Sequence, residues 1–404
     1  MNKQKNENRR QHYVPKFYLR NFSKNSKSVG LYRFKESKMI IDGSINDNLW
    51  KEYFYGDDAI VENELAKYEK KWNDIISTII KTESISDTDS DQIWLRYFML
   101  ISSARTLKRG NQLNNDYTAL IKQILEVEDP EFYERVMNAG ERGLSVKFKY
   151  PTLKFMDIAQ RFLPLVIDLN VDLLINRSHI DYVTSDNPVV FCNQLFQEKN
   201  LSRGFGWGEY GIQFIVPVSP KIAICMYDGE VYDIKEKFLN SSSIINKLNE
   251  LFLDNSDDVL VFANGGNDKA RKEKMSYIEE LVKRKACHFV QDEDNGVMVF
   301  SNKQIYGSYD LSDIFTIKQK YKDIYISSHS EEEINEKINT EEEKILRKLE
   351  KMTEEERESL LSQKKAELIT VSFNDMERTW VKIYNKHQAE IMTLLNIDKT
   401  IHKM

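Results

Sequence analysis

A histidine and an arginine stand in one aromatic segment near the N-terminus. Residues 11–22 read Gln-His-Tyr-Val-Pro-Lys-Phe-Tyr-Leu-Arg-Asn-Phe, after ten mostly polar residues. His12 could act as a general base or acid because the reference pKa of histidine lies near neutrality. Arg20 could bind a phosphate group through two parallel hydrogen bonds. The alternative interpretation is an aromatic segment that only packs the N-terminus against a core.

A carboxylate in a central turn is the strongest single candidate for catalysis. Residues 182–191 read Tyr-Val-Thr-Ser-Asp-Asn-Pro-Val-Val-Phe, the pattern of a strand, a tight turn and a strand. Asp186 could act as a base or bind a divalent metal such as magnesium, and Ser185 and Asn187 could bind substrate. A turn in which Ser185 and Asp186 only satisfy backbone N–H groups is the competing interpretation.

Arg105 lies in a segment with helical periodicity and is the third catalytic candidate. Its guanidinium could stabilise a phosphate, or it could form a buried ion pair with Glu62, Glu64 or Glu69 of the preceding helix. The sequence has no Gly-x-Ser-x-Gly nucleophile elbow, no phosphate-binding P-loop and no clear PD-(D/E)xK pattern. The last absence weakens the assignment to a standard restriction-like nuclease.

Composition favours a globular protein with a sizeable core. Of the 404 residues, 41% are hydrophobic and 11% aromatic, and the net charge of −6 disfavours a surface that is basic throughout, although it permits a local basic cleft. We expect no membrane span, because no apolar stretch is long enough, and a cytoplasmic location, because no secretory signal is present. The three cysteines are widely spaced, which predicts reduced thiols.

The order of the elements predicts an α+β fold in which an N-terminal helical half packs on a mixed or antiparallel sheet core. A hairpin is expected over 29–42, helices over 59–81, 89–127 and 151–170, the last bent at Pro164, and a short helix opening at Pro130. Strands are expected over 171–175, 182–184, 189–192, 212–216, 222–227, 259–263 and 297–301, with helices over 241–255 and 268–284.

These patterns divide the chain into three parts. Residues 1–10 are a polar leader, and 11–328 form the core, with its helical part at about 57–170 and its sheet part at about 171–328. Residues 329–404 are a charged helical extension, which either packs on the core or joins copies of the chain into a homo-oligomer.

Taken together, these motifs resemble one family, domain of unknown function 4238, here called the HYVP family. The resemblance covers about residues 11–310 and includes the segments 103–106, 214–220 and 305–307. Members of that family occur among bacterial anti-phage defence genes, so the resemblance implies a defence effector. We expect a metal-assisted nuclease or another phosphoester hydrolase that acts on nucleic acid. A non-catalytic sensor of a phage-derived trigger and an enzyme acting on a nucleotide are the alternatives. All three hypotheses depend on the meeting of His12, Arg105 and Asp186 in one cavity.

Overall fold

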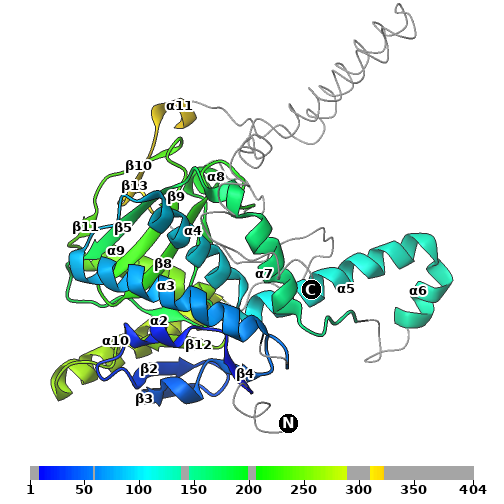
Figure 1. Cartoon of the computed structure of the whole chain (residues 1–404), viewed down its shortest axis with the longest axis horizontal. Helices are drawn as coiled ribbons and strands as arrows, with labels where there is room; N and C mark the ends of the chain where they lie inside the picture. The colour runs from blue at the N-terminus through cyan, green and yellow to red at the C-terminus, as the bar shows by residue number, and fades with distance from the viewer. Residues whose placement is uncertain (1–8, 58–59, 138–144, 199–205, 289–309, 323–404) are drawn as a thin grey trace, which may run out of the picture.

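The structure is a computed structural model that describes residues 9–57, 60–137, 145–198, 206–288 and 310–322. It has the expected α+β architecture, with helices packed against two main sheets (Figure 1). The expected strand over 297–301, the segment 305–307 and the helical extension over 329–404 lie outside the described residues. Among the helices that are described, none is long and apolar enough to cross a membrane.

A short antiparallel ribbon and a one-turn helix fix the N-terminal segment. Strand β1 (Arg10–His12) pairs with β4 (Trp50–Glu52), and His12 lies opposite Trp50. Helix α2 (Lys16–Arg20) starts after Pro15, whose ring fixes φ at −60° in an extended conformation. The central residues of α2 are buried, so the aromatic segment does pack into the core, as one of the two interpretations of it requires.

The first main sheet has four antiparallel strands in the order β3-β2-β12-β6. It confirms the predicted hairpin and the strand near residue 260. Gly30 of β2 lies opposite Phe262 of β12, and the Phe262 ring occupies the space that a side chain at residue 30 would need. The strands are β2 (Ser28–Arg33), β3 (Lys38–Ser44), β6 (Thr184–Ser185) and β12 (Val259–Phe262).

The second main sheet has five strands in the order β11-β5-β9-β8-β7. Only the pairing of β11 with β5 is parallel, so this sheet is mixed, as predicted. Residues 182–192 pass from the first sheet to the second, because β6 and β7 belong to different sheets. The strands are β5 (Asn170–Asn176), β7 (Val190–Cys192), β8 (Gln213–Ser219), β9 (Ile222–Tyr227) and β11 (Phe238–Leu239); a separate ribbon joins β10 (Tyr232–Ile234) to β13 (Phe315–Ile317).

Two hydrophobic clusters cover the two faces of the five-stranded sheet. Alternate residues of a strand point to opposite faces. Phe214 and Val216 of β8 therefore join the cluster formed with the N-terminal segment and helices α3 and α4. Ile215, between them, joins the cluster on the other face, which includes α9 and α10. The helices are α3 (Ile60–Thr82), α4 (Asp89–Ala104), α5 (Leu107–Glu128), α6 (Pro130–Met137), α7 (Pro151–Arg161), α8 (Gln194–Glu198), α9 (Ser242–Asn255), α10 (Asp268–His288) and α11 (Gln319–Lys322).

The prediction of one helix over 89–127 was wrong. Helix α4 ends at Ala104, and Thr106 is extended at φ −102° and ψ 156°, where its hydroxyl accepts a hydrogen bond from the Arg109 N–H and caps α5. The helix predicted over 151–170 also ends early, at Arg161. It is followed by the 3₁₀ turn Leu163–Val166, since Pro164 has no N–H to continue an α-helix.

Candidate functional site

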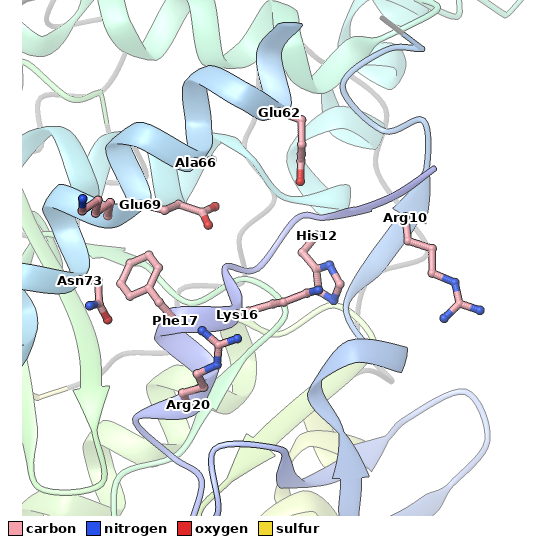
Figure 2. A pocket seen from close by; sticks show the side chains of 10 residues that line it. Arg10, His12, Lys16, Phe17, Arg20, Glu62, Ala66, Glu69 and Asn73 are labelled. Carbon is pink, nitrogen blue, oxygen red and sulfur yellow. The ribbon is translucent and has the colours of Figure 1, made fainter. Parts of the chain in front are cut away.

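A polar pocket of about 390 Å³ lies between the N-terminal segment and helix α3. Figure 2 shows α3 above the pocket and helix α2 below it. Its wall combines basic, acidic and imidazole groups from two parts of the chain that are distant in sequence. The lining residues are Arg10, His12, Lys16, Phe17, Arg20, Glu62, Ala66, Glu69, Lys70 and Asn73, and we call this the His12 pocket.

The ring of His12 is uncharged at neutral pH. Its Nε2 lies 3.1 Å from the carbonyl oxygen of Ile45. A carbonyl can only accept, so this geometry assigns the proton of the neutral ring to Nε2 and leaves a lone pair on Nδ1. Burial, reinforced by the nearby charges of Lys16 and Arg105, lowers the pKa of His12 to about 4. The ring can therefore accept a proton at Nδ1.

Arg105 holds the backbone of His12 in place. The guanidinium is 1% exposed and donates three hydrogen bonds, from Nε to the Tyr55 hydroxyl (3.0 Å), from Nη1 to Glu69 (2.7 Å) and from Nη2 to the carbonyl oxygen of His12 (2.9 Å). The Tyr55 hydroxyl donates to the same His12 carbonyl at 3.2 Å. Arg105 caps the end of α4 instead of lying in mid-helix as predicted, and the ion pair foreseen with one of three glutamates forms with Glu69.

Three cations of the pocket form no ion pair with any other residue that the structure describes. Lys16 and Arg20 are one helical turn apart on α2 and share a face, and Lys70 lies on α3. Arg10 differs from them, because it pairs with Asp47 at 2.9 Å and its side chain points away from His12 in Figure 2. Unpaired cations that converge on one pocket favour an anionic ligand.

Glu62 contributes a buried carboxylate oxygen to the same wall. Its Oε2 has no hydrogen-bond partner within the described part of the chain. Burial raises the pKa of Glu62, and Glu69 adds to this effect, while Arg105 and Lys16 oppose it. Burial thus disfavours the charged forms of both His12 and Glu62. His12 is neutral at pH 7, and Glu62 keeps its proton to a higher pH than a free glutamate does.

Asp186 lies elsewhere and has its own hydrogen-bond partners. Its carboxylate is 5% exposed and accepts three backbone N–H groups, from Asp257 (2.8 Å), Asp258 (2.7 Å) and Val259 (2.9 Å). Burial outweighs these bonds and raises the pKa of Asp186 to about 6. A metal ion at this carboxylate would have to displace backbone donors, so the residues present do not fit the magnesium site considered from the sequence. The described residues contain no group of three or more His, Cys, Asp or Glu that could hold a metal.

The neighbours of Asp186 also form hydrogen bonds within the fold, although the buried Asn187 Oδ1 has no partner among the described residues. The Ser185 hydroxyl donates to the carbonyl oxygen of Asn187 at 3.0 Å and accepts from its N–H at 3.1 Å. The Asn187 amide donates to the carbonyl and side-chain oxygens of Asn255, both at 3.0 Å. This is the geometry of the turn interpretation, in which the segment 185–187 joins the two sheets.

The structure therefore brings together only part of the predicted site. His12 and Arg20 line one pocket, and Arg105 contacts the backbone of His12. The residues of the central turn, Ser185, Asp186 and Asn187, are not among the lining residues of this pocket. The expectation of one cavity shared by His12, Arg105 and Asp186 was wrong in that respect. Sequence reasoning passed over Lys16 and Lys70 and treated Glu62 only as an ion-pair partner; the spacing of Lys16 and Arg20 was the signal available.

Fold and pocket define an α+β protein with a cationic pocket around a neutral histidine. The chain belongs to the family of proteins of unknown function called domain of unknown function 4238, whose model matches residues 10–266. This confirms the resemblance, although the match ends before the segment 305–307. No curated protein and no solved structure matches the chain.

Proposed function

We propose that this protein binds a phosphate-bearing ligand in the His12 pocket and hydrolyses a phosphoester bond there, with nucleic acid as the substrate class. The three cations without ion pairs, Lys16, Arg20 and Lys70, would neutralise phosphate oxygens as negative charge builds up in the transition state. Asp186 has no part in this proposal, because its oxygens are engaged by backbone N–H groups.

Two side chains divide the proton transfers of the reaction. His12 Nδ1 accepts a proton from the attacking water, whose oxygen forms the new bond to phosphorus. Glu62, whose pKa is raised by burial, would donate a proton to the oxygen of the bond that breaks. A bound phosphate would also raise the pKa of His12 towards neutrality, since an anion favours the charged ring.

One observation carries this proposal. A neutral imidazole and a buried carboxyl oxygen without a hydrogen-bond partner line the same pocket as three cations that form no ion pair with any residue the structure describes. Lys16 is partly buried, whereas Arg20 and Lys70 are exposed, so their charges are accessible to a ligand from solvent. Arg105 holds the backbone of His12 in place, which is the pre-organisation that general base catalysis requires.

The proposed setting is bacterial defence against phage, with a phage-derived trigger or nucleic acid as the partner. Its only support is the resemblance of the motifs around His12 and Asp186 to a family found among defence genes. A non-catalytic sensor would use the same pocket to bind without cleaving, and an enzyme of nucleotide metabolism would use it for a single nucleotide.

The test is a comparison of purified wild-type protein with His12→Asn and Glu62→Gln on labelled single-stranded and double-stranded oligonucleotides. We expect each variant to lower kcat by about 100-fold or more, the usual contribution of a general acid or base. Because the pKa of free His12 is about 4, the acid limb of the kcat/KM profile should lie near pH 4 and not near 6.5.

Lys269→Gln is the matched control, since this lysine is exposed on α10 and remote from the pocket. Folded His12→Asn and Glu62→Gln variants with wild-type turnover would end the catalytic proposal. If wild-type protein binds oligonucleotides and leaves them intact, the result favours the non-catalytic sensor over the catalytic proposal. Loss of phage protection in cells that express His12→Asn tests the defence setting.

A further inference from the structure

A second pocket, of about 250 Å³, lies where strand β4 meets the first turns of α5 and α7. It is distinct from the His12 pocket and none of the functional candidates drawn from the sequence lines it. Its lining residues are Lys51, Glu52, Tyr53, Phe54, Leu107, Gly110, Asn111, Lys149, Tyr150, Pro151 and Thr152, and we call it the Thr152 pocket.

The electrostatics of the Thr152 pocket favour an anion. Helix α7 begins at Pro151, and its N-cap residue Tyr150 forms no side-chain cap. The N–H groups of the first turn, which have no intrahelical acceptor in any helix, are therefore not capped by this residue. Lys51 and Lys149 add two exposed positive charges. The acidic residue of the lining, Glu52, is paired with Arg9 at 2.8 Å, which balances its charge.

A buried hydroxyl in this pocket lacks a partner. Thr152 is 1% exposed and its Oγ1 makes no hydrogen bond to any described residue. Gly110 lies directly against it, and a Cβ at residue 110 would stand 2.7 Å from that oxygen. A buried hydroxyl left unpaired costs free energy, so a ligand that supplies an acceptor oxygen would be favoured here.

The aromatic residues add a surface for stacking. Tyr53 and Tyr150 are half-buried at the pocket, and Tyr53 has a φ of 52°, which non-glycine residues seldom adopt. Bases of single-stranded nucleic acid stack on aromatic rings regardless of sequence. The Lys149 ammonium lies 4.9 Å from the centroid of the Tyr150 ring. The half-buried Tyr53 ring beside phosphate-binding groups suits a nucleotide better than a simple inorganic anion.

The two pockets are joined by the ribbon of β1 and β4. Arg10 and His12 of β1 line the His12 pocket, while their partner strand supplies Lys51 and Glu52 to the Thr152 pocket. We propose that the Thr152 pocket is a second phosphate-binding subsite, so that the ligand is a single strand of nucleic acid that crosses the ribbon and not a mononucleotide. This inference rests on the proposed function for the identity of the ligand, and its own evidence is the second pocket.

The test measures the binding of a short labelled single strand and of a labelled mononucleotide to the full chain by fluorescence anisotropy. We expect Thr152→Val combined with Lys149→Gln to weaken binding of the strand about tenfold, the usual effect of losing hydrogen bonds to a charged group. Mononucleotide affinity should stay within about twofold of wild type, since the His12 pocket is intact. Arg20→Gln should weaken both ligands.

Valine has nearly the shape of threonine and removes a hydroxyl that has no partner, so Thr152→Val should keep the fold. Lys269→Gln again controls for the loss of one positive charge. If the double variant binds the strand as tightly as wild type does while Arg20→Gln binds it more weakly, the proposal of a second subsite is wrong and the proposed function is retained. If only the double variant loses binding, the His12 pocket is not the primary site. If wild-type protein binds neither ligand, both the proposed function and the second subsite are wrong.

Discussion

Asp186 and His12 show how two buried polar side chains take different roles according to their hydrogen-bond partners. Both are buried, but every oxygen of Asp186 accepts a backbone N–H, whereas His12 retains a ring nitrogen that can accept a proton. The Asp186 carboxylate joins the start of β12 to the end of β6, since its donors are residues 257–259. Its role is therefore to hold the four-stranded sheet to the turn that follows β6.

The raised pKa of Asp186 predicts a pH-dependent contribution to stability. Folded protein holds a proton between the unfolded pKa of 3.8 and the folded pKa of about 6, so this contribution is present below pH 4 and is lost as the pH rises through 6. The wild type should lose about 3 kcal/mol of unfolding free energy between pH 3 and 7 relative to Asp186→Asn, which does not titrate. Urea unfolding of both proteins at several pH values measures this difference.

Curves that stay parallel across that pH range would contradict the assignment of the raised pKa to Asp186. A companion assay separates structure from catalysis. At a temperature where Asp186→Asn is folded, its hydrolysis of oligonucleotides should stay close to wild type, because Asp186 does not line the His12 pocket.

Among the elements, those whose boundaries depend on local signals could be predicted from the sequence. Helix α3 follows from its apolar spacing, and β5, β8 and β9 follow from their apolar runs. The break between α4 and α5 could not be predicted in this way. The Thr106 hydroxyl that caps α5 is a local signal, but a threonine within a helical pattern does not by itself mark a break, and the neighbouring Arg105 is held by residues from distant parts of the chain.

The candidate site could also be predicted only in part, because sequence patterns do not reveal contacts between distant parts of the chain. The chemistry of His12 and Arg20 is visible in their residue types, but the unpaired Oε2 of Glu62 results from packing of α3 against the N-terminal segment. The separation of Asp186 from His12 is likewise a property of the tertiary fold. Sequence spacing cannot reveal it, because either arrangement is compatible with two polar segments about 170 residues apart.

Substitution of one strand glycine tests the packing of the four-stranded sheet. Gly30→Ala should destabilise the protein by about 1–3 kcal/mol, because the new Cβ would overlap the ring of buried Phe262. Gly265→Ala is the matched control, since the nearest atom to its Cβ would be Lys24 Cβ at 3.9 Å. Chemical unfolding measures both. Equal stability of the two variants would show that the Phe262 ring can move aside without cost.

At the scale of the whole molecule, a negative protein presents local positive pockets. The net charge of −6 repels polyanions at long range, while Lys16, Arg20 and Lys70 attract them within the His12 pocket. Under the proposed function, specific binding would come from close contacts in which phosphates replace counterions, and not from a general basic surface.

This charge distribution predicts the salt dependence of binding. Three phosphate contacts in the His12 pocket alone should contribute a slope of about −2 in a plot of log K against log salt concentration, and a strand that also occupies the Thr152 pocket should give a steeper one. Anisotropy titrations over a series of salt concentrations measure the slope. Arg20→Gln should make it shallower by about 0.7, the share of one contact. A slope near zero for wild-type protein would indicate that the ligand is not held by its phosphates.

The three hydrogen bonds of Arg105 also bear on when the His12 pocket can form during synthesis. The backbone of His12 is held by a side chain that lies 93 residues further along the chain. During synthesis, a nascent polypeptide that ends before helix α4 carries the histidine without its support and without the wall that α3 forms once it is docked. The Tyr18 hydroxyl of α2 donates to the carbonyl oxygen of Pro217, so the pocket takes its final form only after more than half of the chain has been translated, and an activity in it would begin no earlier.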